Sequence, residues 1–108
     1  MSGSVGKPST IFSSLQLGRR LNFMDLDWGD EEVIQLADAL VYVHEEGLAL
    51  PIKIKLYENN IQSDGAKALA EANRKCAGAL DVIEIDLSNN RIGKAGCDAL
   101  AGMKKVDL

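Results

Sequence analysis

An internal repeat constrains the fold of this chain more than any other feature of its sequence. Residues 83–92 begin with alternating apolar and polar side chains, the pattern of a half-buried strand, and residues 93–101 then have the composition of a helix. The same residue pattern occurs earlier in the chain. There Ile54, Leu56, Asn59, Ile61, Gly65, Ala68, Leu69 and Ala70 match Ile85, Leu87, Asn90, Ile92, Gly96, Ala99, Leu100 and Ala101. Self-similarity at a period of about 20–50 residues indicates stacked supersecondary units. The sequence therefore predicts an α/β architecture in which each unit is a strand followed by a helix.

Three units are predicted behind an N-terminal segment at 1–20, over about residues 21–50, 51–81 and 82–108. Their strands are expected over 21–26, 52–56 and 83–87, and their helices over about 30–44, 64–75 and 93–101. The first unit is degenerate, because Gly29 replaces the asparagine of the other units and the turn before its helix is about three residues shorter. Lys104 and Lys105 are expected at the negative end of the last helix.

The N-terminal segment is expected to divide into a flexible head and a cap. Residues 1–9 are rich in Ser and Gly. Ile11, Phe12 and Leu15 then form an apolar stripe that suits a short helix, which Gly18 ends. Such a helix would cover the open end of the first strand, as the terminal caps of repeat arrays do. The acid-free head also has a weak likeness to a transit peptide, so organelle targeting by this segment stays open.

The composition is that of one small domain with few aromatic residues. Of 108 residues, 46 % are apolar, 26 % charged and 5 % aromatic. The formal charge of −4 is unevenly spread, because residues 21–51 hold eight acids and no base. This acid-rich stretch suits a protein partner with a basic surface. The bases are too few and too scattered for a nucleic-acid interface, and no apolar run approaches the roughly 18 residues of a membrane span.

The two cysteines, Cys76 and Cys97, have neither the number of a disulfide framework nor the spacing of a metal site. Cys97 occupies the position that Ala66 holds one repeat earlier, so we expect a buried thiol there, and also at Cys76. Buried, reduced thiols favour a reducing compartment, and we expect an intracellular, cytoplasmic location.

The repeated residues resemble leucine-rich repeats. They read Leu-x-x-Met-x-Leu at 21–26 and Ile-x-Leu-x-x-Asn-x-Ile at 54–61 and 85–92. The continuations at 64–70 and 95–101 are similar to the ribonuclease-inhibitor-like subclass, whose repeats are a strand plus a full helix. This resemblance implies a short α/β solenoid with parallel strands on its concave face, helices on its convex face and an N-terminal cap. It also implies that Asn59 and Asn90 are structural residues that turn inward and bond backbone groups, and that the protein binds other proteins.

Parallel strand pairing predicts which side chains share the exposed face of the sheet. At the repeat spacing, one row holds Asp25, Lys55 and Asp86, and a second row holds Phe23, Lys53 and Glu84. Opposite charges on neighbouring strands stabilise by up to about 1 kcal/mol per pair, so one interpretation is a self-neutralised surface. The other is a partner contact, since aromatic residues framed by charge suit a protein interface. The candidate partner-binding residues, with Trp28 at the centre, are Phe23, Asp25, Asp27, Trp28, Lys53, Lys55, Tyr57, Glu84 and Asp86.

No residue pattern in the sequence indicates catalysis. The acids at Asp25 and Asp27 have the start of a calcium loop, but Leu36 stands where its bidentate acid belongs. The one histidine, His44, is expected at a helix end, and no nucleophile, base and orienting group can be assembled. We therefore expect a non-enzymatic protein without a metal or cofactor.

Two functions remain open from the sequence. One is a binding module that captures a protein partner on its concave strand face. The other is a small structural subunit, wedged into a larger multiprotein assembly through its open ends and its N-terminal tail. Partner contacts on Phe23, Trp28 and Tyr57 would favour the first function, and contacts on the repeat ends would favour the second.

Overall fold

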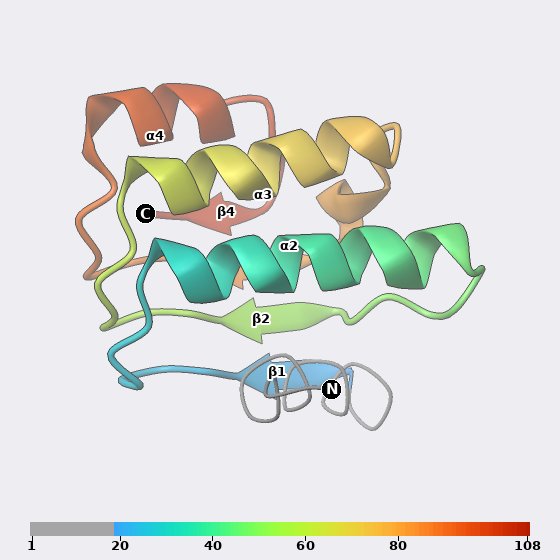
Figure 1. Ribbon diagram of the computed structural model, residues 1–108, viewed down its shortest axis with the longest axis horizontal. Helices are drawn as coiled ribbons and strands as arrows, with labels where there is room; N and C mark the ends of the chain where they lie inside the picture. The colour runs from blue at the N-terminus through green and yellow to red at the C-terminus, as the bar shows by residue number, and fades with distance from the viewer. Residues whose placement is uncertain (1–18) are drawn as a thin grey trace.

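The computed structural model describes residues 19–108, and the expected N-terminal cap with Ile11, Phe12 and Leu15 lies outside the described residues. The described chain alternates short strands and helices (Figure 1). The elements are β1 (Arg20–Asn22), α2 (Asp30–Glu45), β2 (Lys53–Lys55), α3 (Ser63–Lys75), the 3₁₀ turn η1 (Ala79–Val82), β3 (Glu84–Asp86), α4 (Gly93–Leu100) and β4 (Val106–Asp107). Within this part of the chain, three strand–helix units are followed by one more strand.

The strands and helices form two layers. The strands make one parallel sheet in the order β1-β2-β3-β4. Helices α2, α3 and α4 lie side by side on one side of this sheet and run in the opposite direction to the strands (Figure 1). Each helix therefore returns the chain to the start of the next strand, which parallel pairing requires. The sheet and the helices confirm the predicted α/β repeat fold.

The core lies between the two layers, because alternate strand residues point at the helices. Leu21, Ile54 and Ile85 form one buried row across β1, β2 and β3. The second row and the helix residues that close the core over it are Phe23, Leu56 and Leu87, with Leu36, Leu69 and Leu100. The repeat thus places the same residue types at the same depth in each unit.

The register of the first strand differs from the expected one. Leu21 pairs with Ile54, and Arg20 pairs with Lys53, whereas the predicted row set Phe23 beside Lys53. Because successive side chains point to opposite faces, a shift by an odd number of residues exchanges the two faces of a strand. Phe23 therefore lies on the core side, and Arg20 takes the exposed place beside Lys53.

The register that pairs Leu21 with Ile54 continues through the turn and helix of the first unit, so its turn is not shortened. At the same offset, Leu36 matches Leu69 in the helices, and Trp28 matches Ile61 in the turns. The residue at the position of the repeated asparagine is Leu26, not Gly29. The first unit therefore differs from the other two by residue substitutions, and the prediction that its turn is about three residues shorter is wrong.

A glycine in α3 and another in α4 allow neighbouring helices to approach closely. A Cβ on Gly96 would lie 2.5 Å from Ile92 Cγ2 and 3.1 Å from Ala66 Cβ. Gly65 has the same place in α3, where a Cβ would lie 2.8 Å from a carboxylate oxygen at the start of α2. In α2 this position holds Glu32, whose carboxylate accepts a hydrogen bond from the backbone at the start of that helix. The two glycines therefore mark the positions where one helix stacks on the previous one.

The end of the third unit also differs from the expectation. Helix α4 ends at Leu100, so Lys104 and Lys105 lie beyond its last turn. They lead into β4, in which Val106 pairs with Ile85 of β3. This strand and the turn η1 were not predicted, because such short elements do not produce a periodic pattern.

The burial of Cys97 is the opposite of the prediction. Cys97 is exposed and Cys76 is buried. In α3 the corresponding residue, Ala66, is covered by α4, whereas Cys97 lies on α4 itself, which no further described helix covers. Burial raises the pKa of the Cys76 thiol, and the negative charge of Glu45 adds to this shift.

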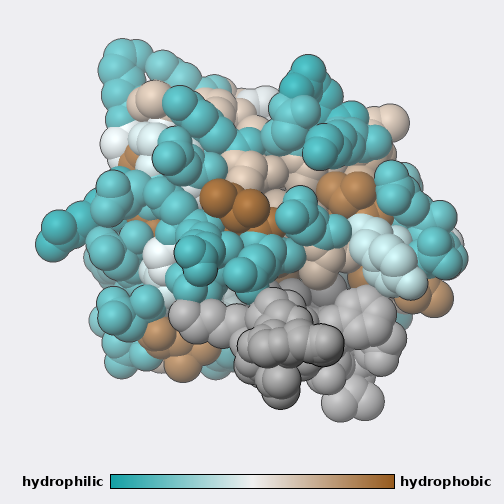
Figure 2. Space-filling model, in the orientation of Figure 1, coloured by the Kyte–Doolittle hydropathy of each residue, from teal (hydrophilic) through white to brown (hydrophobic). Residues whose placement is uncertain are grey.

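The helix side of the molecule is mainly hydrophilic. Figure 2 shows hydrophilic side chains over much of this surface, with apolar side chains visible between them. Ile34 and Tyr42 of α2 are among the exposed apolar residues. Across residues 19–108, none of the helices has the length and apolar character needed to cross a membrane.

Candidate functional site

Asn59 ties the turn of the first unit to that of the second. Its Oδ1 accepts hydrogen bonds from the N–H groups of Leu26 and Trp28, each at 2.9 Å. Its Nδ2 donates to the C=O groups of Phe23 (2.8 Å), Leu56 (3.0 Å) and Tyr57 (3.3 Å). One side chain therefore satisfies backbone groups of two successive turns, which buried backbone requires.

Asn90 makes the same connection between the second and third units. Its Oδ1 accepts from the N–H of Ile61 at 2.9 Å. Its Nδ2 donates to the C=O groups of Leu56 (2.9 Å), Leu87 (3.0 Å) and Ser88 (3.2 Å). Both asparagines turn inward and bond the backbone, as the resemblance implied, and they hold the carboxyl ends of the strands in place.

The face of the sheet turned away from the helices, here called the outer sheet face, carries polar side chains in rows. The first row is Arg20, Lys53 and Glu84, and the second is Asn22, Lys55, Asp86 and Asp107. Lys53 Nζ lies 3.8 Å from Glu84 Oε1. The structure therefore brings together four of the predicted site residues, namely Lys53, Lys55, Glu84 and Asp86.

Tyr57 follows β2 and lies beside the turn of the first unit. Its hydroxyl lies 2.8 Å from the Sδ of Met24 and donates to it, and its C=O accepts from the N–H of Asp25 at 3.2 Å. On the next strand, Ser88 donates from its N–H and its hydroxyl to Asp86 Oδ1, at 3.0 and 2.6 Å. A partly buried aromatic ring thus follows β2, and an oriented carboxylate belongs to the neighbouring strand β3.

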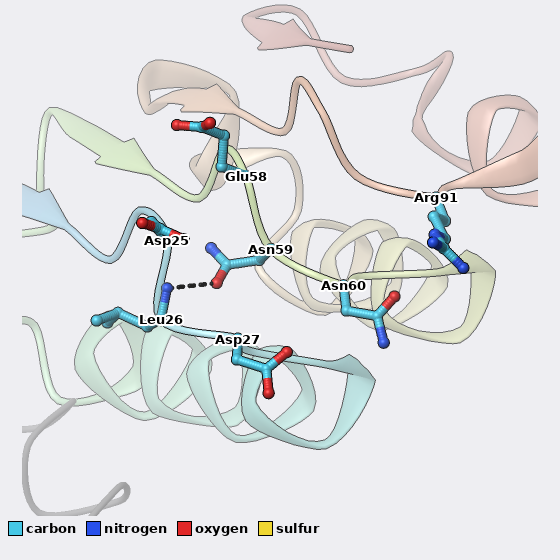
Figure 3. Close-up of a pocket in the computed structure, with 7 residues that line it drawn as sticks. All are labelled: Asp25, Leu26, Asp27, Glu58, Asn59, Asn60 and Arg91. Atoms are coloured by element: carbon cyan, nitrogen blue, oxygen red, sulfur yellow. Dashed lines mark hydrogen bonds between the residues drawn. The ribbon is translucent and has the colours of Figure 1, made fainter.

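An open hollow of about 620 Å³, here called the turn hollow, lies where the strands lead into the helices (Figure 3). Its lining residues are Asp25, Leu26, Asp27, Glu58, Asn59, Asn60 and Arg91. Three of them, Asp25, Asp27 and Glu58, have positive φ angles of 52°, 55° and 60°. Aspartate tolerates this left-handed region better than most residues. The turn geometry therefore presents three carboxylates and one guanidinium at the same edge.

Phe23 and Trp28 do not belong to the exposed site, so the prediction that these two rings lie on the exposed face is wrong. They are only 4 % and 5 % exposed, and their rings stack with centroids 4.5 Å apart. The physical reason is the register of β1, which sets Phe23 beside Leu56 and places Trp28 at the position of Ile61. Both aromatic rings therefore replace aliphatic core residues of the other units.

The sequence reasoning missed several residues of this surface. Arg20 belongs to the outer sheet face, and Leu26, Glu58 and Arg91 line the turn hollow. Leu26 is 51 % exposed, although it holds the place of the inward-turned asparagine. A signal for this arrangement was present, because the match between the first and second helices already fixes the offset between their units. Applying that offset to the first strand would have placed both Arg20 and Leu26.

The polar groups of this surface are suited to reversible contacts. Over the described part of the chain, no group of three or more histidine, cysteine or acidic residues could hold a metal ion. His44 lies in the last turn of α2, on the helix layer. Carboxylates, ammonium groups and one aromatic ring at fixed spacing can form hydrogen bonds and ion pairs with another protein.

Two segments of the chain, residues 54–70 and 82–101, match the family described as Leucine Rich repeat. The first segment runs from β2 into α3, and the second contains β3 and α4. A search of curated proteins returns no match to the chain. Leucine-rich repeats generally act as non-enzymatic modules of protein–protein interaction. The second and third units of this chain are therefore leucine-rich repeats.

Proposed function

We propose that this chain is a protein-interaction module that binds a partner through the outer sheet face. The observation that carries the proposal is the set of partly exposed charged and aromatic side chains that parallel pairing holds at fixed spacing on this face. These residues are Lys53, Lys55, Tyr57, Glu84 and Asp86. We further infer that the array is a short solenoid of the ribonuclease-inhibitor-like subclass, with this face on its concave side and residues 1–20 as its cap.

The partner is expected to bring a basic surface to the edge of this face. Asp25 and Asp27 are exposed, and both line the turn hollow together with Glu58. Within residues 19–108, none of these three carboxylates forms an ion pair. Unpaired exposed carboxylates attract basic groups and raise the association rate, while a partly buried ring adds contact area.

Affinity measurements on surface variants test this proposal. A partner captured from a native extract by the full chain would be purified, and its affinity would be measured for Lys55→Glu and Asp86→Lys. Each variant should weaken binding by roughly tenfold or more, because a reversed charge within an interface sets like charges against each other. Lys67→Glu is the matched control, because Lys67 is an exposed residue of α3 on the helix layer. Equal losses for the control and the face variants would refute binding through the outer sheet face.

A second candidate function is a structural subunit that contacts a larger assembly through the end of the array. The observation that favours it is Leu108, which is 55 % exposed, whereas residues at the same strand position, Leu56 and Leu87, are buried. Leu108→Asp should then abolish partner binding while Lys55→Glu leaves it unchanged. The opposite pattern would support the outer sheet face.

A further inference from the structure

We propose that the surface formed by the outer sheet face and the turn hollow selects an extended peptide segment of its partner by the order of its charges. An acidic end of this segment would lie against the amino ends of the strands, and a basic end would lie in the turn hollow. This inference rests on the proposed function, because it specifies the partner segment that the same surface accepts.

The amino ends of the strands carry a positive excess. Arg20, Lys53 and Lys105 lie there with one acid, Glu84. The ion pair of 3.8 Å between Lys53 and Glu84 engages one of these bases. Arg20 and Lys105 are exposed and have no ion-pair partner within residues 19–108, so they remain available to an acidic group.

The carboxyl ends of the strands carry a negative excess. The turn hollow presents Asp25, Asp27 and Glu58 against one base, Arg91. Figure 3 shows these side chains arranged around the opening, with Arg91 on the far side of Asn60 from the three acids. A lysine or arginine of the partner can enter this opening of about 620 Å³ and meet carboxylates on two successive turns.

Between these two regions lie first the second row, in which Lys55 stands beside Asp86, and then an apolar step. Tyr57 and Met24 touch through the contact of 2.8 Å between the hydroxyl and the sulfur, and Leu26 is exposed at the border of the hollow. The distance along the strand from Lys53 to Glu58, at about 3.3 Å per residue, is roughly 16 Å. An extended segment of about five or six residues therefore spans the surface, with an apolar side chain between its acidic and basic ends.

The preferred order of charges in the partner segment follows from ion pairing at both of its ends. A segment in the matching order meets opposite charges at the strand starts and in the hollow. The reversed order sets acid against acid in the turn hollow and base against base near Arg20, which is a repulsive arrangement that rejects a partner of the same composition. The two segments have the same composition, and only the order of their charged residues distinguishes them.

The test uses a displayed library of random peptides of about ten residues, a length that covers the span estimated from strand geometry. The full chain is the target, and the best peptide is resynthesised together with a twin in which every acid and base are exchanged. Two domain variants are compared with the parent by calorimetry. One carries Arg20→Glu, Lys53→Glu, Asp27→Lys and Glu58→Lys, which invert the charge layout, and the other carries Asp25→Asn and Asp27→Asn. Asparagine keeps the tolerance for positive φ, so the second variant retains the turn if the first does not fold.

The parent should prefer the selected peptide over its twin by a factor on the order of ten. The inverted domain should prefer the twin, and the asparagine variant should lose most of the preference. The preference should also shrink between about 0.01 M and 1 M salt, over which the Debye length falls from about 30 Å to about 3 Å. Peptides that bind the face but show equal affinity for selected peptide and twin would overturn the charge order and leave the proposed function standing. A library that yields no binder of the outer sheet face would overturn both.

Discussion

Replacing Asn59 by alanine should destabilise the protein by roughly 2–4 kcal/mol. The side chain accepts two hydrogen bonds and donates three, all to backbone groups. Water can replace it at the exposed N–H of Leu26, but the groups at Trp28, Phe23 and Leu56 are partly or fully shielded. Each of these lost bonds costs about 1 kcal/mol, and more where the group stays unpaired. A protein of this size has a total stability of about 5–15 kcal/mol, so the change is a large fraction of it.

Urea unfolding followed by the fluorescence of Trp28 measures this loss, because the single tryptophan is buried against Phe23. Asn60→Ala is the matched control. Asn60 is the next residue and is exposed, and its side chain makes no hydrogen bond to any residue of 19–108. The control should unfold within about 0.5 kcal/mol of the parent, as most surface substitutions do. Equal unfolding midpoints for Asn59→Ala and Asn60→Ala would show that the asparagine does not hold the turns together.

Packing and exposure can be tested at five further positions. Gly96→Ala should lower the free energy of unfolding by about 1–3 kcal/mol, since its Cβ would lie 2.5 Å from Ile92 Cγ2 and 3.1 Å from Ser63 and Ala66 of α3. Gly102→Ala, with nothing within 4 Å of its Cβ, should change it little. Equal unfolding midpoints would contradict the close packing around Gly96. A thiol reagent should label Cys97 rapidly in the native protein and Cys76 only on unfolding, because burial raises the pKa of the Cys76 thiol. Equal labelling rates of the two cysteines in the native protein would contradict the burial of Cys76. Trp28→Ala should cost about 3–5 kcal/mol as a core truncation, and a loss of partner affinity without a loss of stability would return Trp28 to the binding surface.

The fold could be predicted where the residues repeat. The match between the second and third units, from Ile54 to Ala70 and from Ile85 to Ala101, carries the strand pattern, the turn asparagine and the helix stripe together. Because the same residue types recur at the same spacing, each unit must bury the same positions, and parallel stacking follows. The structure has the expected strands and helices there, with boundaries that differ by no more than one residue at each end.

The candidate site was predicted only in part, because it depends on the register of the first unit. Lys53, Lys55, Glu84 and Asp86 belong to the two matching units, and all four lie on the outer sheet face. The sequence prediction assigned Phe23 to the wrong face of the sheet. The pattern Leu-x-x-Met-x-Leu at 21–26 fits two registers of the first strand that differ by three residues. Local sequence does not distinguish these registers, since both keep apolar residues on the side of the strand that faces the helices.

The sequence by itself determined the repeating α/β unit and its two turn asparagines, because periodicity and residue type already specify which groups need burial and which need a hydrogen bond. The tertiary structure decided which neighbour each unit receives. Trp28 is buried because its place in the stacked array is that of Ile61. Cys97 is exposed because no described helix covers α4, although its counterpart Ala66 is covered. The burial of a residue in a stacked array depends on the adjacent unit as well as on its own, and sequence identity within one unit does not report that contact.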